Sequence, residues 1–366
     1  MSQSDPLGLL RSQIDKIDEQ LVIFLNKRAS VALEIGKIKK SQDASLYAPG
    51  REKQILDRLT QTNPGPFPNG ALRNVFREIM SGALLVQEGE TVAYLGPAAT
   101  FTHLACLQRF GASVQALPVP SIQAVFEAVE KGKVHFGIVP VENSIEGVVN
   151  HTLDLFVDSH LLIEGEILQE VSHCLMSKTG ERKKIKKIYS HSHALAQCSR
   201  FLETKFPGIP VVAIESTAMA AQKALKESSA AAIASELAAR LYQLNLIEEH
   251  IEDYRNNITR FLLLSQKPAR PTGRDKTSIL FAIADCVGGL YKILRPFSEH
   301  QINLTRIESR PSKKRPWEYF FYVDAVGHQE EEKMRTALSQ LKETALFVKI
   351  LGSYKMADEL TAGGPS

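Results

Sequence analysis

Residues 9–42 read LLRSQIDKIDEQLVIFLNKRASVALEIGKIKKSQ, and this stretch decides the fold of the N-terminal part of the chain. No proline interrupts it, so we predict a single helix of about 34 residues, roughly 50 Å long. A domain of about 90 residues has no core wide enough to cover such a helix, and we expect it to pack against a second copy of itself in a dimer. Apolar residues recur at spacings of three and four, typical of one helical stripe: Leu10, Ile14, Ile17, Leu21, Phe24 and Leu25.

The rest of the N-terminal part is also helical in pattern. Tyr47–Gly50 ends the long helix, and a second helix begins near Arg51. The turn Asn63–Pro66 ends the second helix, and a third runs from about Asn69 to Gln87. We therefore predict an all-α N-terminal domain.

From Thr91 onward, short apolar strands alternate with helical stretches. This alternation is typical of βαβ units, so we predict an α/β domain with a largely parallel sheet. Strands are expected at residues 92–95, 136–139, 187–189, 211–214 and 231–234, and helices at 121–131, 194–205, 218–228 and 236–244.

The C-terminal part begins after a proline-containing linker, Lys267–Gly273. Its elements follow the order βαββαβ, which is the ferredoxin-like α+β plan. They are expected at residues 277–283, 288–299, 303–308, 318–326, 330–344 and 347–351. We thus predict three domains, at residues 1–90, 91–268 and 275–355, followed by a tail at 356–366.

The composition excludes several classes of protein. Of the 366 residues, 44% are hydrophobic and 23% are charged, which is ordinary for a soluble globular chain. A net charge of only +3 argues against a dedicated nucleic-acid binder. No apolar run approaches the roughly 20 residues needed to cross a bilayer, and the start of the chain has no signal-peptide pattern. We expect a cytoplasmic protein with reduced thiols rather than a zinc or redox site at Cys106, Cys174, Cys198 and Cys286.

Two cations of the long helix are spaced to share one face. Arg28 and Lys39 are eleven residues apart, so they project in nearly the same direction with about 16 Å between them. Two long side chains at that distance leave room for a small anion. Arg11 points about 100° away and would reach the pocket of a partner subunit instead. The spacing alone leaves open that all three are solvated surface charges.

The order and spacing of certain residues resemble the all-helical, intertwined-dimer class of chorismate mutases over most of residues 5–90. The matching positions are Leu10-Arg11, Arg28, Gly36–Lys39, Arg51-Glu52 and Gln87. That family converts chorismate to prephenate by a pericyclic rearrangement that needs neither cofactor nor metal. Two positions depart from the pattern, since Ala48 stands where aspartate is common and Ala83 where serine is common.

The resemblance implies a role for each matching side chain. Arg28 and Arg11 of the partner subunit would hold the carboxylates of the substrate. Lys39 and Gln87 would hydrogen-bond the breaking ether oxygen. Glu52 would bind the ring hydroxyl, and Arg51 would support the site.

In the middle domain, polar residues gather where strands give way to loops or helices, the edge at which open α/β sheets bind ligands. Hydroxyls at such positions can equally be helix N-caps, as Ser216 and Thr217 would be. His191 and His193 have no acidic or cysteine partner at a metal-ligand spacing, so no metal is expected. The sequence contains neither GxGxxG nor GxxxxGK[ST], so no nucleotide cofactor is expected either.

Four ordered motifs make residues 91–266 resemble prephenate dehydratase, a family with two βαβ lobes like those of periplasmic binding proteins and a site between them. The motifs are Thr100–Thr102, Pro140–Gly147, Ser190–Cys198 and Thr259–Phe261. Ala99 departs from the family, which usually has glycine in that turn.

The resemblance implies that Thr259 gives a proton to the leaving hydroxyl of prephenate and that Arg260 binds a carboxylate. Phe261 would pack beneath the site. The pocket would be lined by Thr100, Asn143, Ser144, Ser190 and His191.

The third domain resembles an ACT domain, a regulatory module that binds amino acids where two copies meet. The resemblance rests on the motifs Gly288–Tyr291 and Glu308–Pro311, with further matches at Asn303-Leu304 and Pro316–Tyr319. The residues implied to bind phenylalanine as a feedback inhibitor are Gly288, Gly289 and Leu290 of the first motif and Glu308, Ser309, Arg310 and Pro311 of the second. Val287 and Gly289 replace the usual proline and alanine. A glycine pair at a helix start exposes N–H groups to a carboxylate, but it is also a common tight turn.

Together the three resemblances cover nearly the whole chain in the order of a bifunctional chorismate mutase–prephenate dehydratase. They imply chorismate, prephenate and phenylalanine as ligands, no cofactor, and a homodimer or higher oligomer. Two alternatives remain at this point. One is a dehydratase whose mutase domain serves only for dimerisation, and the other is a non-catalytic two-lobed sensor of amino acids.

Overall fold

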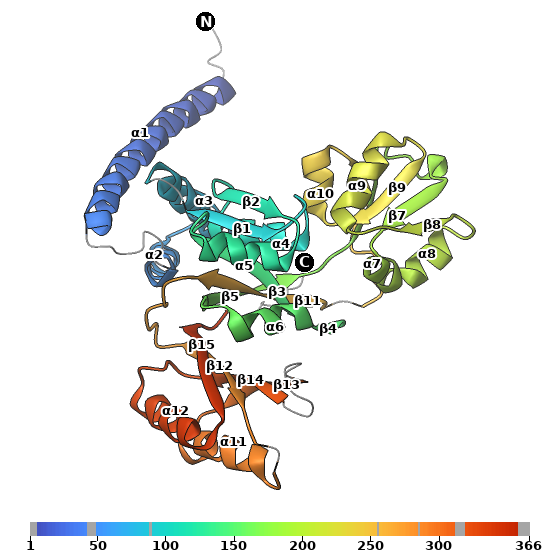
Figure 1. The fold of residues 1–366 in the computed structure, drawn as a ribbon. Helices are drawn as coiled ribbons and strands as arrows, with labels where there is room; N and C mark the ends of the chain where they lie inside the picture. The colour runs from blue at the N-terminus through green and yellow to red at the C-terminus, as the bar shows by residue number, and fades with distance from the viewer. Residues whose placement is uncertain are drawn as a thin grey trace, which may run out of the picture. The chain divides into compact units, whose positions relative to one another are not determined.

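The computed structural model describes residues 6–41, 49–87, 90–254, 256–284, 286–311 and 319–357 (Figure 1). The described residues form two compact units. One unit comprises the chain up to Thr91 together with Phe110–Gln115, and the other comprises Val92–Arg109 and the chain from Ala116 onward.

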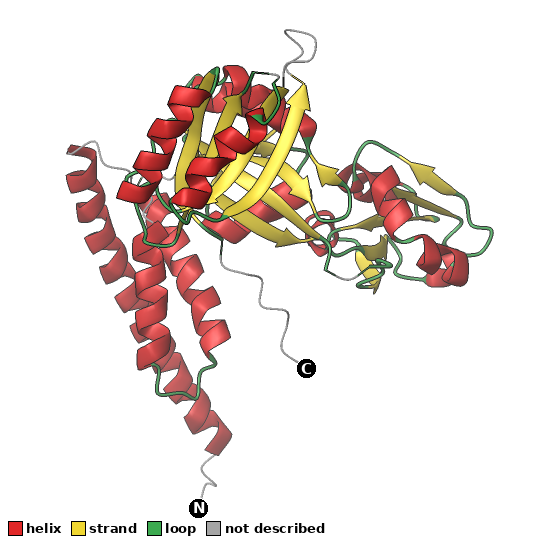
Figure 2. Ribbon diagram, turned by 90° about the horizontal axis from the view of Figure 1, so that it is seen from below, coloured by secondary structure: helices red, strands yellow, loops and turns green. Residues whose placement is uncertain are grey.

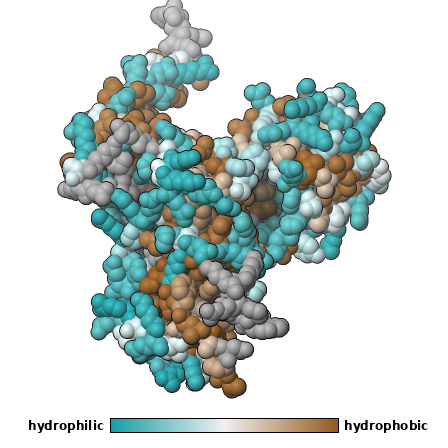
Figure 3. Space-filling model, in the orientation of Figure 1, coloured by the Kyte–Doolittle hydropathy of each residue, from teal (hydrophilic) through white to brown (hydrophobic). Residues whose placement is uncertain are grey.

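The first unit is helical, as predicted. Helix α1 (Pro6–Ser41) is a single uninterrupted helix, followed by α2 (Pro49–Thr62) and α3 (Asn69–Val86). Helix α3 packs against both α1 and α2, and the three lie along one another in Figure 2. The apolar stripe of α1 remains on the surface of this unit, where Ile14 is 57% exposed and Phe24 is 64% exposed. Figure 3 shows this stripe as brown atoms along α1. Within a single chain, the long helix is therefore left with an uncovered apolar face.

The second unit contains two lobes and a C-terminal module, and it confirms the predicted two-lobed α/β plan. In the first lobe lie β1 (Thr91–Leu95), α4 (Phe101–Phe110), β2 (Gln115–Val119), α5 (Ile122–Glu130), β3 (Phe136–Asn143), β4 (Gly147–Val148), α6 (Asn150–Asp158), β5 (Leu162–Glu170) and β11 (Ile258–Ser265).

The second lobe holds the chain between β5 and β11. Its elements are β6 (Cys174–Ser177), a 3-10 turn (Arg182–Lys184), β7 (Lys187–Ser190), α7 (Ser192–Gln197), α8 (Ser199–Lys205), β8 (Val211–Ala213), α9 (Thr217–Lys226), β9 (Ala230–Ala234), α10 (Glu236–Tyr242) and β10 (Asn245–Glu248).

Both sheets are mixed, so the prediction of a largely parallel sheet is only partly right. Strands β1 and β3 are parallel, but β11 runs antiparallel to both β3 and β5. In the second lobe β7 is parallel to β8 and β9, whereas β6 is antiparallel to β9 and β10. The sheet of the first lobe is mixed because the chain leaves this lobe after β5 and returns to it through β11 in the opposite direction.

The C-terminal module confirms the βαββαβ prediction. Its elements are β12 (Asp275–Ala282), α11 (Gly289–Glu299), β13 (Leu304–Pro311), β14 (Tyr319–Val326), α12 (Glu332–Thr344) and β15 (Phe347–Lys355). The strand order β13-β14-β12-β15 is antiparallel throughout, and α11 and α12 share a core with one face of the sheet.

The other face of this sheet packs on the first lobe. Leu280, Tyr322 and Tyr354 of the module lie in one hydrophobic cluster with Phe156 and Ile163 of the lobe. The two sheets are also joined edge to edge, because β15 pairs with β5. The lobe and the module therefore form one continuous packed body. No described helix is long and apolar enough to cross a membrane.

Gly352 provides a test of this junction. Its φ of 151° disfavours a side chain, and a Cβ there would overlap the carbonyl oxygen of Ile163 on β5. We expect Gly352→Ala to lower the stability of the second unit by about 1–3 kcal/mol, measured by calorimetry. Gly165→Ala is the matched control, because Gly165 lies at the same junction and its nearest neighbour would be 3.7 Å away. Equal effects of the two substitutions would contradict this view of the junction.

Candidate active sites

The helical unit contains a cavity of about 510 Å³. Five of the six side chains predicted from the sequence line it together: Arg28, Lys39, Arg51, Glu52 and Gln87. Apolar residues complete the wall, including Phe24, Val31, Ile35 and Met80. Three predicted cations facing one carboxylate make the cavity suitable for a small dianion.

The partial burial of Arg28 favours the binding of an anion in this cavity. The pKa of Arg28 is lowered because burial removes water from its guanidinium, so an anionic ligand would restore the lost solvation. Gly36 of α1 brings the helix close to Gln87, because a Cβ at Gly36 would lie 3.1 Å from the Gln87 Cγ. The absence of a side chain at Gly36 thus allows the Gln87 side chain to pack against α1.

The remaining predicted side chain, Arg11, is exposed on α1 and does not line this cavity. This placement agrees with the expectation that Arg11 serves another subunit. Ala83 lines the cavity wall where the family commonly has serine. Ala48 lies outside the described residues.

The second unit contains a cleft of about 1050 Å³ that is lined from both lobes. Figure 3 shows it as a hollow with apolar atoms at its base. Five of the predicted dehydratase residues line the cleft: Thr100, Asn143, His191, Thr259 and Phe261. Ser144, Ser190 and Arg260 do not.

The two serines have structural partners instead. Ser190 is fully buried and donates to the carbonyl oxygen of Ile233 at 2.7 Å. Ser144 accepts from the backbone N–H of Ile258 at 2.9 Å and so ties its loop to the start of β11. Both serines hydrogen-bond the backbone near the cleft wall and do not line the cleft.

Asn143 and Thr259 meet at the base of the cleft. Asn143 Nδ2 donates to Thr259 Oγ1 at 2.8 Å and to Asn257 Oδ1 at 2.7 Å. Its Oδ1 accepts from the backbone N–H groups of Ile145 and Glu146, which fixes the amide orientation. Because Thr259 Oγ1 already accepts a hydrogen bond, its own proton is available to a ligand in the cleft.

The hydrogen-bond network extends to residues that the sequence did not single out. Asn257 Nδ2 donates to Gln197 Oε1 at 2.9 Å, and Gln197 Nε2 donates to Glu146 Oε1 at 3.0 Å. Gln197 lies within the motif Ser190–Cys198, and Asn257 lies two residues before Thr259, so the sequence contains a signal for both. His173 lies outside those motifs, and only the folded structure shows that it lines the cleft.

His173 is held neutral and in one tautomer. Its Nε2 lies 3.0 Å from Gln197 Oε1, which can only accept, so the proton is on Nε2. Burial lowers the pKa of His173, and it also lowers the pKa of His191 with help from His193. His103 accepts from the N–H of Ala99 through Nδ1, and burial lowers its pKa as well. The lowered pKa values favour the neutral imidazole of His103, His173 and His191 at neutral pH.

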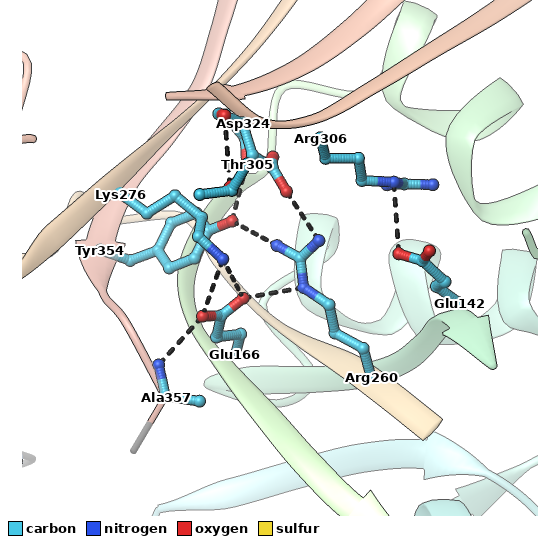
Figure 4. A network of polar contacts seen from close by, with 10 residues as sticks. Glu142, Glu166, Arg260, Lys276, Thr305, Arg306, Asp324, Tyr354 and Ala357 are labelled. Carbon is cyan, nitrogen blue, oxygen red and sulfur yellow. Dashed lines mark hydrogen bonds and ion pairs between the residues drawn. The ribbon is translucent and has the colours of Figure 1, made fainter. Parts of the chain in front are cut away.

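Arg260 is the clearest departure from the sequence-based prediction. Strand β11 places Thr259 and Phe261 on the cleft face and Arg260 on the opposite face. Its guanidinium lies 2.7 Å from Glu166 and 2.6 Å from Asp324 (Figure 4). The prediction that Arg260 binds a ligand carboxylate is therefore wrong for this arrangement, because both carboxylates already occupy it.

The turn that carries Ala99, where the family usually has glycine, has a conformation that glycine favours. Ala99 has φ 69°, the left-handed region that favours glycine. However, its Cβ packs in a buried cluster of the second lobe and does not line the cleft. The extra methyl group therefore does not narrow the pocket.

A third cavity, of about 380 Å³, lies in the C-terminal module. The predicted Gly288, Gly289 and Leu290 line it with Tyr319 and Phe321. The second predicted motif lies on β13 and does not line it, although Ser309 and Pro311 pair with Phe321 and Tyr319. Within one chain the two motifs do not form a single pocket.

Among the described residues, no group of three or more His, Cys, Asp or Glu side chains could hold a metal ion. All four cysteines are free.

Comparison with known proteins assigns each region to a family. Residues 10–88 match the family model of chorismate mutase type II, residues 92–269 that of prephenate dehydratase, and residues 277–343 that of the ACT domain. A bifunctional chorismate mutase/prephenate dehydratase of Aquifex aeolicus is 47% identical over 96% of this chain and 99% of its own length. The chain belongs to this bifunctional family. The alternatives of a mutase domain used only for dimerisation and of a non-catalytic sensor are not favoured.

Solved structures resemble the dehydratase and ACT regions. A prephenate dehydratase from Arthrobacter aurescens in complex with L-Phe is 35% identical, with a TM-score of 0.68 over 75% of this chain and 92% of that one. A protein described as a quorum-quenching acylase, GqqA, is 30% identical with the same TM-score, over 73% of this chain and 98% of its own.

The close approach of Gly36 to Gln87 yields a prediction for the mutase cavity. Gly36→Ala should displace Gln87 by a few tenths of an ångström and lower the rate of chorismate rearrangement about three- to tenfold, because catalysis depends on placement. The measurement is chorismate consumption by the purified variant. Gly70→Ala, at a position with open space around it, should leave the rate unchanged, as should prephenate turnover in both variants.

Proposed function

We propose that each cavity performs one step of a two-step conversion, chorismate to prephenate in the helical unit and prephenate to phenylpyruvate in the cleft. The observation that carries this proposal is the hydrogen bond from Asn143 Nδ2 to Thr259 Oγ1 in the cleft, in which the threonine oxygen is the acceptor and its hydroxyl proton is not used. It gives the cleft an oriented proton donor at neutral pH.

In the helical cavity the reaction needs positioning and charge stabilisation rather than a nucleophile. Arg28 and Arg11 of the partner subunit hold the two carboxylates of chorismate. Lys39 and Gln87 donate hydrogen bonds to the ether oxygen as its bond breaks, and Glu52 binds the ring hydroxyl. Arg51, which lines the same wall, supports the site.

In the cleft, prephenate loses its ring hydroxyl and one carboxylate together. The bond between the ring and the hydroxyl breaks, and the hydroxyl takes the proton of Thr259 and departs as water. Thr259 Oγ1 regains a proton from solvent water before the next turnover. The bond to the carboxylate breaks as CO2 leaves, and its electron pair completes the aromatic ring. Asn143 stabilises the charge that develops on Thr259 Oγ1, which makes an otherwise weak acid effective.

The proposal also covers inhibition by phenylalanine, the homodimer and the location in the cell. Phenylalanine binds beside Gly288–Leu290, with Glu308–Pro311 of a second copy closing the site, and it shifts the population between two arrangements. The exposed stripe of α1 supports a homodimer, in which Arg11 reaches across the interface. We also place the enzyme in the cytoplasm, where free cysteines remain reduced.

If the two reactions take place in separate sites, one substitution should abolish one activity and leave the other unchanged. Lys39→Ala should abolish chorismate consumption and spare prephenate turnover, because Lys39 lines only the helical cavity. Thr259→Ala should do the reverse, and Thr259→Ser should keep part of the activity because it retains the hydroxyl. Purified variants are given chorismate or prephenate, with and without phenylalanine, and phenylpyruvate is measured. Loss of both activities in a folded single variant would contradict two independent sites.

A shared mutase site predicts complementation. Arg11→Ala and Lys39→Ala chains should each be inactive as mutases. A heterodimer of the two has one intact site, so randomly mixed dimers should recover about a quarter of the wild-type mutase rate. The mixture is prepared by co-expression, and its oligomeric state is checked by light scattering. Recovery near zero in confirmed heterodimers would show that Arg11 serves its own chain.

A further inference from the structure

The two strands that carry the proton donor also carry a pair of charges on their other face. Thr259 of β11 is paired with Asn143 of β3, and the next residues, Arg260 and Glu142, are paired with each other. Alternation along a strand sends neighbouring side chains to opposite faces. Thr259 and Asn143 therefore face the cleft, while Arg260 and Glu142 face the ACT sheet.

The ACT sheet presents a complementary pair. Asp324 of β14 and Arg306 of β13 are paired in register. The Arg260 guanidinium lies 2.6 Å from Asp324, and Arg306 Nε lies 3.3 Å from Glu142 (Figure 4). Two cross-strand pairs of opposite charge thus meet face to face, directly behind the residues of the cleft.

Arg260 is the most strongly held member of this group. Its Nε contacts Glu166, its Nη1 contacts Asp324, and its Nη2 donates to the Tyr354 hydroxyl at 3.0 Å. Its side chain is only 12% exposed, and those of Glu166 and Asp324 are 4% and 7% exposed.

The carboxylate partners are themselves fixed from the ACT sheet. Lys276 of β12 binds both oxygens of Glu166 at 3.1 Å, and Ser278 of the same strand donates to Asp324 at 2.5 Å. The two buried carboxylates are thus balanced by two cations. Arg260 cannot turn toward the cleft without leaving Asp324 buried and short of a counter-charge.

We propose that Arg260 is a positioning residue for dehydration, through which Asp324 of the ACT sheet holds Thr259 in its catalytic place. The inference rests on the proposed role of Thr259. The backbone of β11 transmits the position of Arg260 to Thr259, because the two are adjacent on one strand. The ACT sheet is then part of the structure that shapes the cleft, and a shift of β14 relative to the lobe acts on Thr259 through the contact of Asp324 with Arg260.

The test compares two neutralised carboxylates in the intact protein without phenylalanine. Asp324→Asn weakens the hold on Arg260. Asp154→Asn is the matched control, because Asp154 of α6 also forms an ion pair with an ACT arginine, Arg310 at 3.0 Å, but lies on a helix rather than on β11. Prephenate turnover gives kcat and KM, and chorismate turnover reports on the helical unit.

We expect Asp324→Asn to lower kcat for prephenate by about tenfold or more with KM within about twofold, as for a displaced catalytic group. Asp154→Asn and all chorismate rates should stay near wild type. Arg260→Lys keeps the charge but loses the forked geometry and should lower kcat in the same way. The double variant Arg260→Lys/Asp324→Asn should be no slower than the slower single variant, because both act through one contact.

Other outcomes would overturn the proposal. A large rise in KM for Arg260→Lys, with Asp324→Asn unaffected, would make Arg260 a substrate ligand. An equal fall of kcat in Asp154→Asn would indicate general loosening between lobe and module. If Asp324→Asn does not fold, Ser278→Ala removes the hydroxyl that donates to Asp324 and also contacts the Tyr354 hydroxyl, and an unchanged kcat there would count against the proposal. Absence of phenylpyruvate formation by the wild-type protein would instead contradict the proposed function.

Discussion

The buried ion pair between Arg260 and Asp324 joins the strand that carries Thr259 to the ACT sheet. Burial alone would raise the pKa of Asp324, but Arg260, Ser278 and Lys276 outweigh it and leave that pKa below its usual value. Its contribution to stability is therefore present above the carboxylate's ordinary pKa and is lost as the pH falls through the lowered value. Breaking such a buried pair typically costs about 3–5 kcal/mol, because the remaining charge stays buried.

This contact gives β11 and β3 two functions on their two faces. One face carries Asn143 and Thr259 into the cleft, and the other carries Arg260 and Glu142 to the ACT sheet. A strand is suited to this division, because consecutive side chains diverge while the backbone between them stays rigid. The first lobe is thereby both a wall of the dehydratase site and the docking surface of the regulatory module. The mutase cavity is built from its own three helices and needs none of these contacts.

Much of the architecture could be predicted from the sequence because it is encoded in local patterns. The spacing of apolar residues and the absence of proline in residues 9–42 predicted one long helix, and the structure confirms it as α1. Arg28 and Lys39 lie eleven residues apart on that helix, and they do line one cavity. The βαββαβ order of the third domain is likewise confirmed, because each of its elements is short and bounded by turn residues.

What could not be predicted depends on partners distant in the sequence. Strands β5 and β11 were missed, and with them the antiparallel pairings that make the first sheet mixed. His173 enters the cleft only because β6 brings it beside Gln197. Arg260 was misassigned even though strand alternation through Thr259, Arg260 and Phe261 would have set it apart. Its carboxylate partners lie 94 and 64 residues away, so no local pattern pointed to them.

The most direct test of the link between ACT sheet and cleft is amide hydrogen exchange in the wild-type protein and in Asp324→Asn. If Asp324 holds β11 through Arg260, exchange should become faster at Phe261 and its neighbours on β11 and β3 and should stay unchanged in α1, α2 and α3. Unchanged exchange along β11 in a folded Asp324→Asn protein would contradict the claim that this ion pair positions Thr259.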